Sequence, residues 1–271
     1  MNAKSIREWY ANAPKVRRPC WCGWHTGNVY AHEDRHGVPL ELIVCGRCST
    51  VRVANYLSDE AIDDLYRTKY RALFDNDGPA AIYDAQLKNG VAMRKALGIT
   101  SAECVIDFGS GAGGLLDAFP DARAIGIEPG EYARYGQARG SKAEIATHAS
   151  PAFDGCADYV FAIHTLEHRV DLVVALAMHA ALLKPDGRLV VEFPSLAVYE
   201  RSYETLSRYL QAPHYWQFTE ATLVDAARRS GLTATRRGRP EGVVEFCLST
   251  NVDSESDHLL KTGGATERGS V

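Results

Sequence analysis

The chain has 271 residues and a net charge of −4; 46% of the residues are hydrophobic and 24% are charged. This composition is ordinary for a globular protein and leaves room for one large α/β domain beside a smaller unit. The acidic balance argues against a nucleic-acid partner, and no segment reaches the ~20 consecutive apolar residues of a membrane-spanning helix.

The amino-terminal segment, "MNAKSIREWYANAPKVRRPC", lacks the apolar stretch of a signal peptide, which predicts a cytoplasmic protein. The odd number of cysteines, 7, does not fit a disulfide framework. Four of them instead lie near one another in the sequence, at Cys20, Cys22, Cys45 and Cys48.

Short strand-like segments, "LELIVC" and "STVRVANYL", accompany the second cysteine pair. Two cysteine pairs on short hairpins are typical of a zinc ribbon, in which four thiolates hold the ion and replace a core too small to be stable alone. We therefore predict a zinc-binding segment over residues 1–57. Four protein ligands leave no open coordination position, which indicates a structural rather than a catalytic site.

Two alternatives remain for the cysteine segment. The first pair is C-x-C rather than the commoner C-x-x-C, so His25, His32 or His36 is an alternative ligand. Reduced cysteines without a metal are the other interpretation.

A helical connector is predicted over residues 58–98. Its first helix covers "SDEAIDDLYRTKYRALF", where Asp59 and Glu60 favour a helix start. The sequence "DNDGP" separates it from a second helix in "AAIYDAQLKNGVAMRKAL". Tyr66 and Tyr70 share a face of the first helix, for which packing and a lid over a bound ligand are both possible roles.

Strands and helices alternate over residues 99–250. Strands are predicted in "CVIDF", "ARAIGI", "DYVFAIH" and "RLVVEFP", and helices in "GGLLDAF", "LVVALAMHAALL" and "TEATLVDAARRSG". This alternation predicts an α/β fold with a parallel sheet and helices on both faces. The segments "LTATRRG" and "VVEFCLST" are expected to add an antiparallel terminal hairpin. A tyrosine-rich insertion at about residues 195–217 is expected to cap a pocket, and residues 251–271 are expected to be disordered.

A glycine-rich turn follows the first strand of this region. Asp107 lies at the strand end, and Gly109, Gly111 and Gly113 follow in "GSGAGG". Glycines permit a tight turn and let a ligand approach the backbone. No Lys-Ser/Thr pair follows, so the turn is not a phosphate-binding loop. Glu128 ends the next strand about 20 residues further on, where an acidic residue accepts hydrogen bonds from a ribose.

Four segments in order, "VIDFGSGAGGLLDAF", "IGIEP", "DYVFAIHTLEH" and "LLKPDGRLVVEFP", resemble the sequential motifs of class I S-adenosylmethionine-dependent methyltransferases. The resemblance covers about residues 103–248 and implies a Rossmann-like enzyme with a small-molecule methyl donor. A nicotinamide-dependent oxidoreductase is the alternative for the glycine turn. The resemblance implies donor contacts from Asp107, Gly109, Ser110, Gly111, Glu128, Pro129, Ser150 and His164.

The upstream pieces "CWCG", "DRHGVPLELIVCGRC" and "LYRTKYR" are similar to the metal-binding front end of bacterial methyltransferases from surface-polysaccharide and deoxysugar pathways. This implies O-methylation of a sugar hydroxyl in a surface glycan or a nucleotide-sugar. C-methylation of a keto-deoxysugar nucleotide, O-methylation of a small metabolite, and a non-catalytic scaffold are the alternatives. Aromatic residues that are expected to stack on a sugar are Tyr199, Tyr203, Tyr209, Tyr215 and Trp216.

The segment "IHTLEH" places His164, Glu167 and His168 at i, i+3 and i+4, on one face of an expected helix at a strand end. His168 is the expected general base for a hydroxyl acceptor, oriented by Glu167 and with His164 as a further catalytic candidate. The second chemistry is a divalent cation held by all three, because quinone-biosynthesis O-methyltransferases have a similar Glu-x-x-Glu-His patch. The third interpretation is a solvated helix start. His214, in "APHYWQFT", is a further candidate for catalysis or packing.

Overall fold

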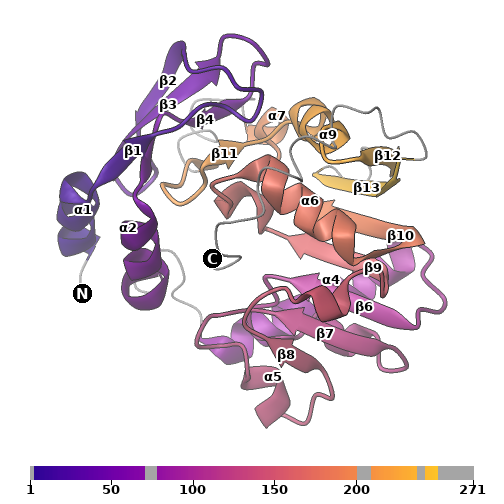
Figure 1. The fold of residues 1–271 in the computed structure, drawn as a ribbon. Coiled ribbons are helices and arrows are strands. Elements are labelled where there is room, and N and C mark those ends of the chain that lie inside the picture. Colours follow the sequence, from indigo (N-terminus) through magenta and orange to yellow (C-terminus); the bar gives the residue numbers. More distant parts are fainter. Residues whose placement is uncertain (1–2, 71–77, 200–208, 237–241, 250–271) are drawn as a thin grey trace.

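The computed structural model describes residues 3–70, 78–199, 209–236 and 242–249, and the structural statements below concern these residues. A large sheet with its helices lies beside a smaller amino-terminal unit (Figure 1). Among the described residues, the strands form a seven-stranded, a four-stranded and a two-stranded sheet. No helix within these ranges has the length and apolar character needed to cross a membrane.

The seven-stranded sheet forms the centre of the larger part of the molecule. Its strands are β6 (Cys104–Phe108), β7 (Arg123–Ile127), β8 (Glu144–Ala146), β9 (Ala157–Ile163), β10 (Leu183–Glu192), β12 (Leu232–Arg236) and β13 (Val243–Leu248). They lie in the order β12-β13-β10-β9-β6-β7-β8. The strands from β6 to β10 pair in parallel, and β13 and β12 add to β10 in antiparallel fashion. The predicted fold class is confirmed.

Helices and short turns connect these strands. They are α4 (Pro79–Ala96), η2 (Leu116–Ala118), α5 (Tyr135–Ala138), η3 (Pro151–Phe153), η4 (Leu166–His168), α6 (Leu172–Leu182), α7 (Leu196–Tyr199) and α9 (Glu220–Arg228). Every residue of β6 is buried, as expected for a parallel strand covered on both faces. Asp171 caps α6 by accepting a hydrogen bond from the Val174 amide, and Thr219 and Thr222 form a capping box at α9.

The segment after β9 differs from the prediction. His164 adopts the left-handed conformation with φ 50°, and the 3-10 turn η4 follows in place of a helix start. The Thr165 hydroxyl lies 3.0 Å from the carbonyl oxygens of Phe108 and Ile163. It therefore links the ends of β6 and β9 and does not cap a helix. The prediction that His164, Glu167 and His168 share one helical face was therefore wrong. The helix predicted after the glycine turn is likewise reduced to the 3-10 turn η2.

The amino-terminal unit consists of one helix and two small antiparallel sheets. Its elements are α1 (Ala3–Asn12), β1 (Lys15–Arg17), β2 (Gly27–Glu33), β3 (Pro39–Cys45), β4 (Val51–Val53) and β5 (Asn55–Leu57). Strand β1 pairs with β5, while β2, β3 and β4 form a meander. A fourth strand joins that meander from far along the chain, because β11 (Trp216–Gln217) pairs with β4. One buried core cluster consequently includes Tyr56, Leu166 and Trp216.

The connector contains α2 (Asp59–Asp64), which continues directly into a π-helical turn, η1 (Leu65–Lys69). The Ser58 side chain caps α2 by accepting a hydrogen bond from the Ala61 amide. The second predicted helix of the connector is present as α4. The middle of the predicted insertion, residues 200–208, and the predicted disordered tail, residues 251–271, lie outside the described residues.

Candidate active site

The turn that follows β6 has a backbone conformation that favours glycine. Gly109, Gly111 and Gly113 have φ values of 84°, 52° and 86°, in the left-handed region. The Gly109 amide donates a hydrogen bond of 2.8 Å to the carbonyl of Ile127, which joins the turn to the end of β7. A Cβ atom at position 109 would lie 2.5 Å from the Oγ1 atom of Thr165. The turn therefore packs directly against the residues that follow β9.

Gly109→Ala is expected to lower the free energy of unfolding by about 2 kcal/mol or more, because the left-handed backbone costs ~1–2 kcal/mol and the new Cβ collides with Thr165. Denaturant unfolding measures the change. Gly98→Ala is the matched control, since Gly98 also has a positive φ of 68° but its Cβ meets nothing within 4 Å. Equal losses for the two variants would show that the contact with Thr165 contributes nothing.

Three polar side chains surround the glycine turn. Glu128 accepts hydrogen bonds from the amides of Gly111 and Gly130, at 3.0 and 2.6 Å. Asp107 is buried with its Oδ1 atom unpartnered, and burial, reinforced by the charge of Glu128, raises its pKa to about 7. The Ser110 hydroxyl is also buried without a partner. Buried polar groups normally have hydrogen-bond partners, so this turn fits a ligand that carries hydroxyl and ammonium donors, as S-adenosylmethionine, the methyl donor predicted from the sequence, does.

Two further residues of the predicted donor set, Pro129 and Ser150, flank β8 in the sequence. Ser150 caps η3, because its side chain accepts a hydrogen bond from the Ala152 amide at 3.3 Å. Pro129 is exposed directly after Glu128. The structure thus brings Asp107, Glu128 and the glycines together at one turn, and it gives Ser150 a local structural contact.

His164 lies between two carboxylates at the carboxyl ends of β9 and β10. Its ring nitrogens are 3.5 Å from Glu167 Oε1 and 3.4 Å from Glu192 Oε1. Burial opposes a charge on the imidazole, but Glu167 and Glu192 together raise the pKa of His164 to about 10. His164 is therefore a cation at neutral pH and has no lone pair for a base. Asn89 of α4 donates a hydrogen bond of 3.0 Å to the other oxygen of Glu192.

Glu167 is the most deeply buried acid of this region, with 1% of its side chain exposed. Burial by itself would raise its pKa, but His164, His168 and His214 lower the pKa of Glu167 to about 2. Neither carboxylate oxygen accepts a hydrogen bond. One donor atom each from Glu167, His168 and His214 lie within 4.8 Å of one another. The carboxylate is thus available to stabilise a positive charge on a neighbouring imidazole.

His168 is surrounded by aromatic rings from two other segments. Its Nδ1 atom lies 3.0 Å from the hydroxyl of Tyr66 in η1. The rings of Tyr66 and Tyr70 stack at 5.1 Å and both make T-shaped contacts with the imidazole, while His214 meets it perpendicularly at 4.7 Å. Burial lowers the pKa of His168, and it lowers the pKa of His214 to about 3. Both imidazoles are neutral at pH 7.

The sequence identified part of this arrangement. His214 was a candidate for either catalysis or packing, and it lies against His168 from a segment 46 positions later in the chain. The pairing of Tyr66 with His168 and the role of Glu192 were not foreseen. For Glu192 a signal existed, because it ends the strand "RLVVE" at the same edge of the sheet as His164.

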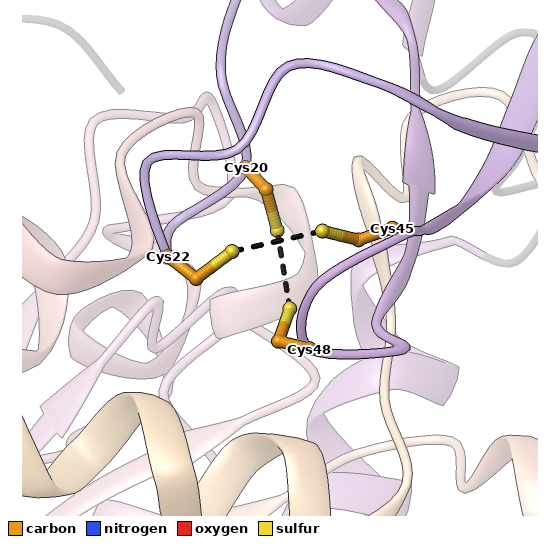
Figure 2. Close-up of side chains that lie close together, drawn as sticks. All are labelled: Cys20, Cys22, Cys45 and Cys48. Atoms are coloured by element: carbon orange, nitrogen blue, oxygen red, sulfur yellow. Dashed lines mark hydrogen bonds between the residues drawn. The ribbon is translucent and has the colours of Figure 1, made fainter.

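The four cysteines of the amino-terminal unit point toward one another from two chain segments (Figure 2). The Sγ atoms of Cys20 and Cys48 are 3.5 Å apart, and those of Cys22 and Cys45 are 3.6 Å apart. Disulfide sulfurs are ~2.05 Å apart, whereas the edges of a tetrahedron with 2.3 Å zinc–sulfur bonds measure about 3.8 Å. All four Sγ atoms lie within 4.8 Å of one another, and no histidine belongs to the group that the described residues form. The cluster fits a tetrahedral ion with four thiolate ligands.

Comparison with known proteins identifies the family of the chain. The model of a family described as "Methyltransferase domain" matches residues 69–236. The C-methyltransferase NovU of Streptomyces niveus is 28% identical over 188 residues, which cover 63% of this chain. The chain matches only 42% of the length of that relative.

Two solved structures have similar folds. The mitomycin 7-O-methyltransferase MmcR has a TM-score of 0.50 at 20% identity, with 71% of this chain and 66% of that chain covered. The magnesium protoporphyrin IX methyltransferase ChlM of Synechocystis PCC 6803, solved with bound S-adenosylhomocysteine, has a TM-score of 0.50 at 18% identity, with 70% and 99% covered. At these identities the likeness concerns the fold. The family match covers more than half of the chain and leads to one conclusion: the chain belongs to the methyltransferase domain family.

Proposed function

We propose that this enzyme methylates a sugar hydroxyl, in a surface glycan or a nucleotide-sugar, with His168 as the general base. The observation that carries the proposal is a neutral, half-buried imidazole at the carboxyl end of β9, next to the ionised Glu167. The glycine turn contacts Thr165, three positions before His168. The donor-binding residues and the base are therefore neighbours at one edge of the sheet.

The residues of the site have different roles in the proposed methyl transfer. The glycine turn and Glu128 bind the donor, which supplies an electrophilic methyl group when it is bound. His168 takes the proton of the acceptor hydroxyl, and the Glu167 carboxylate stabilises the imidazolium that results. His164, already charged, holds Glu167 ionised and in place. We favour a base over a divalent cation because His164, one of the three predicted ligands, is a cation between Glu167 and Glu192 and has no lone pair to offer a metal.

The structure removes most of the aromatic residues that were expected to bind a sugar acceptor. Tyr209, Tyr215 and Trp216 were expected to stack on a sugar, but all three are at most 4% exposed and pack into the core. The Tyr203 residue and the side chain of Tyr199 lie outside what the structure describes. The proposal therefore depends on the similarity of the amino-terminal segment to methyltransferases of surface-polysaccharide and deoxysugar pathways. The half-buried Tyr66 and Tyr70 rings are the aromatic surface that remains beside the base.

An assay with a tritiated methyl donor tests the acceptor. Nucleotide-sugars, nucleotide-linked keto-deoxysugars, lipid-linked glycans and small phenols form the acceptor panel. Label transferred to a sugar oxygen, located by NMR of the product, supports the proposal. Label transferred to the phenols alone contradicts it.

C-methylation is the second candidate, because the relative NovU is named a C-methyltransferase. Carbon methylation requires removal of a C–H proton next to a carbonyl. A keto-sugar incubated with the protein in deuterated water should therefore gain deuterium at the acceptor carbon. A hydroxyl acceptor gains none. Deuterium in the recovered keto-sugar would replace the O-methylation proposal with this one.

Glu128→Ala is expected to weaken the binding of S-adenosylhomocysteine by about 10- to 100-fold, because hydrogen bonds to a charged acceptor contribute ~1.5–3 kcal/mol. Isothermal titration calorimetry measures the affinity. Glu144→Ala is the control, since Glu144 is exposed on the neighbouring β8 and pairs with Arg123. If the unaltered protein shows no binding at millimolar ligand, it is a scaffold rather than an enzyme.

We also propose that Cys20, Cys22, Cys45 and Cys48 hold a structural zinc ion and that residues 1–57 are a metal-binding segment. The sulfur–sulfur distances support this assignment. None of the seven cysteines forms a disulfide, so the four thiols of the cluster are available as ligands. The metal content of the purified protein tests it.

A further inference from the structure

The hydrogen bonds of His168 indicate which of its nitrogens carries the proton. The Nδ1 atom lies 3.0 Å from the Tyr66 hydroxyl, which leaves Nε2 for the second partner of the ring. A hydrogen bond with the backbone of Pro213 raises the pKa of His168, and because proline has no N–H its carbonyl is the acceptor. We infer that this bond involves Nε2, since Nδ1 faces Tyr66. A carbonyl only accepts, so Nε2 carries the hydrogen and Nδ1 has the lone pair. Tyr66 therefore donates to Nδ1.

This tautomer has a consequence for catalysis. The one lone pair that makes neutral His168 a base is covered by the hydroxyl of Tyr66. The acceptor substrate reaches that lone pair only by displacing Tyr66 or by acting through it. The second route needs no rearrangement, because the tyrosine hydroxyl can accept one proton while it gives up its own.

We propose that Tyr66 is a catalytic residue that relays the acceptor's proton to His168. This inference depends on the proposed function, in which His168 is the base. As the acceptor oxygen bonds to the methyl carbon supplied by the donor, its O–H bond breaks and that proton moves to the Tyr66 oxygen. The original Tyr66 proton moves to His168 Nδ1. Tyr66 ends neutral, and the positive charge resides on His168 beside the Glu167 carboxylate.

The electrostatics of the cluster agree with a concerted relay. Burial, reinforced by Tyr70, raises the pKa of Tyr66 well above its ordinary value, so Tyr66 remains a neutral hydroxyl and does not persist as a phenolate. The ionised Glu167 favours a proton on His168, whereas His164 and Arg169 oppose it. The neutral His214 meets the ring perpendicularly at 4.7 Å.

The local fold explains how Tyr66 reaches this position. Helix α2 widens into the π-helical turn η1, a feature that is frequent at functional sites. Lys69 at the end of η1 forms an ion pair with Asp64 and lies 4.8 Å over the ring of Trp9 in α1. The amino-terminal unit thus holds the turn of the connector that presents Tyr66 to the active site.

The tautomer can be tested without knowing the acceptor. Nitrogen-15 NMR of histidine-labelled protein should show His168 with a protonated Nε2 and an unprotonated Nδ1, and His168→Gln assigns the signals. Tyr66→Phe should shift the Nδ1 resonance and raise the pKa of His168 by about 0.5–1 unit, because it removes a hydrogen bond that favours the neutral ring. A protonated Nδ1 in the unaltered enzyme overturns the relay.

Turnover provides the second test, with whichever nucleotide-sugar of the tritium panel is methylated. Tyr66→Phe should reduce kcat about 100-fold and leave the affinity for S-adenosylhomocysteine within twofold. Tyr159→Phe is the matched control, because Tyr159 lies on β9 five residues before His164, the variant keeps the ring stacked on Phe161, and kcat should change less than threefold. The solvent deuterium effect on kcat should vary nonlinearly with deuterium fraction, as two protons move.

The possible failures are distinguishable. Full turnover of Tyr66→Phe, combined with an inactive His168→Ala, rejects the relay and keeps His168 as a direct base. Full turnover of both variants rejects the proposed function itself. A linear deuterium dependence indicates one transferred proton and also rejects the relay.

Discussion

His168→Ala should lower kcat by about 10²- to 10⁴-fold, the usual contribution of a general base, while S-adenosylhomocysteine binds as before. The reason is spatial, because His168 belongs to the cluster at the end of β9 and none of the hydrogen bonds around Glu128 involves it. The methyl-transfer assay and calorimetry on the same preparation measure the two quantities. His32→Ala, at an exposed position of β2, is the matched control for loss of an imidazole. Normal turnover in His168→Ala would refute the assignment of the base.

The pH dependence of the unaltered enzyme gives an independent check on this assignment. Catalysis needs the neutral imidazole, and burial lowers the pKa of His168 below its ordinary value of 6.5. The acid-side midpoint of the rate should therefore lie below pH 6.5. A midpoint above pH 6.5 would point to a different base.

Cys45→Ser should abolish stoichiometric zinc and lower the stability of the protein by several kcal/mol, which corresponds to a fall in Tm of about 10 °C or more. Zinc sites of this kind contribute their binding energy directly to folding, and Cys45 is a buried residue at the end of β3. Elemental analysis and thermal unfolding measure both effects. A chelator added to the unaltered protein should produce the same unfolding curve.

Cys247→Ser is the matched control, because Cys247 is a half-buried thiol on β13 and is not part of the cysteine cluster. It should keep one zinc ion per chain and the original unfolding midpoint. Retention of zinc by Cys45→Ser would instead assign the ion to other ligands.

The parts of the fold that the sequence predicted well are those governed by local chemistry. The glycine turn after β6 was predictable because positive φ angles at Gly109 and Gly111 require that residue type. The parallel sheet followed from apolar strands that alternate with helices, as β6 and α6 illustrate. The cysteine cluster followed from spacing alone.

The parts that the sequence did not predict depend on contacts between distant segments. The spacing of His164, Glu167 and His168 suggested a helix, but Thr165 binds the carbonyl ends of β6 and β9 and forces a turn. The insertion's aromatic residues looked suited to a ligand, yet the pairing of β11 with β4 buries Trp216 in the core. The protonation of His164 depends on Glu192, whose strand lies next to its own only after folding.

The two-residue strand β11 has a consequence for protein engineering. The backbone of Tyr215, just before it, accepts a hydrogen bond from the Val53 amide and donates one to the carbonyl of Glu167, at 2.9 and 2.8 Å. Grafting the amino-terminal unit of a relative onto this catalytic part would sever that link unless the stretch from residue 209 to residue 217 came with it. Hybrid enzymes should therefore exchange the amino-terminal unit and residues 209–217 together, because the two segments form one structural module that is interrupted in the sequence.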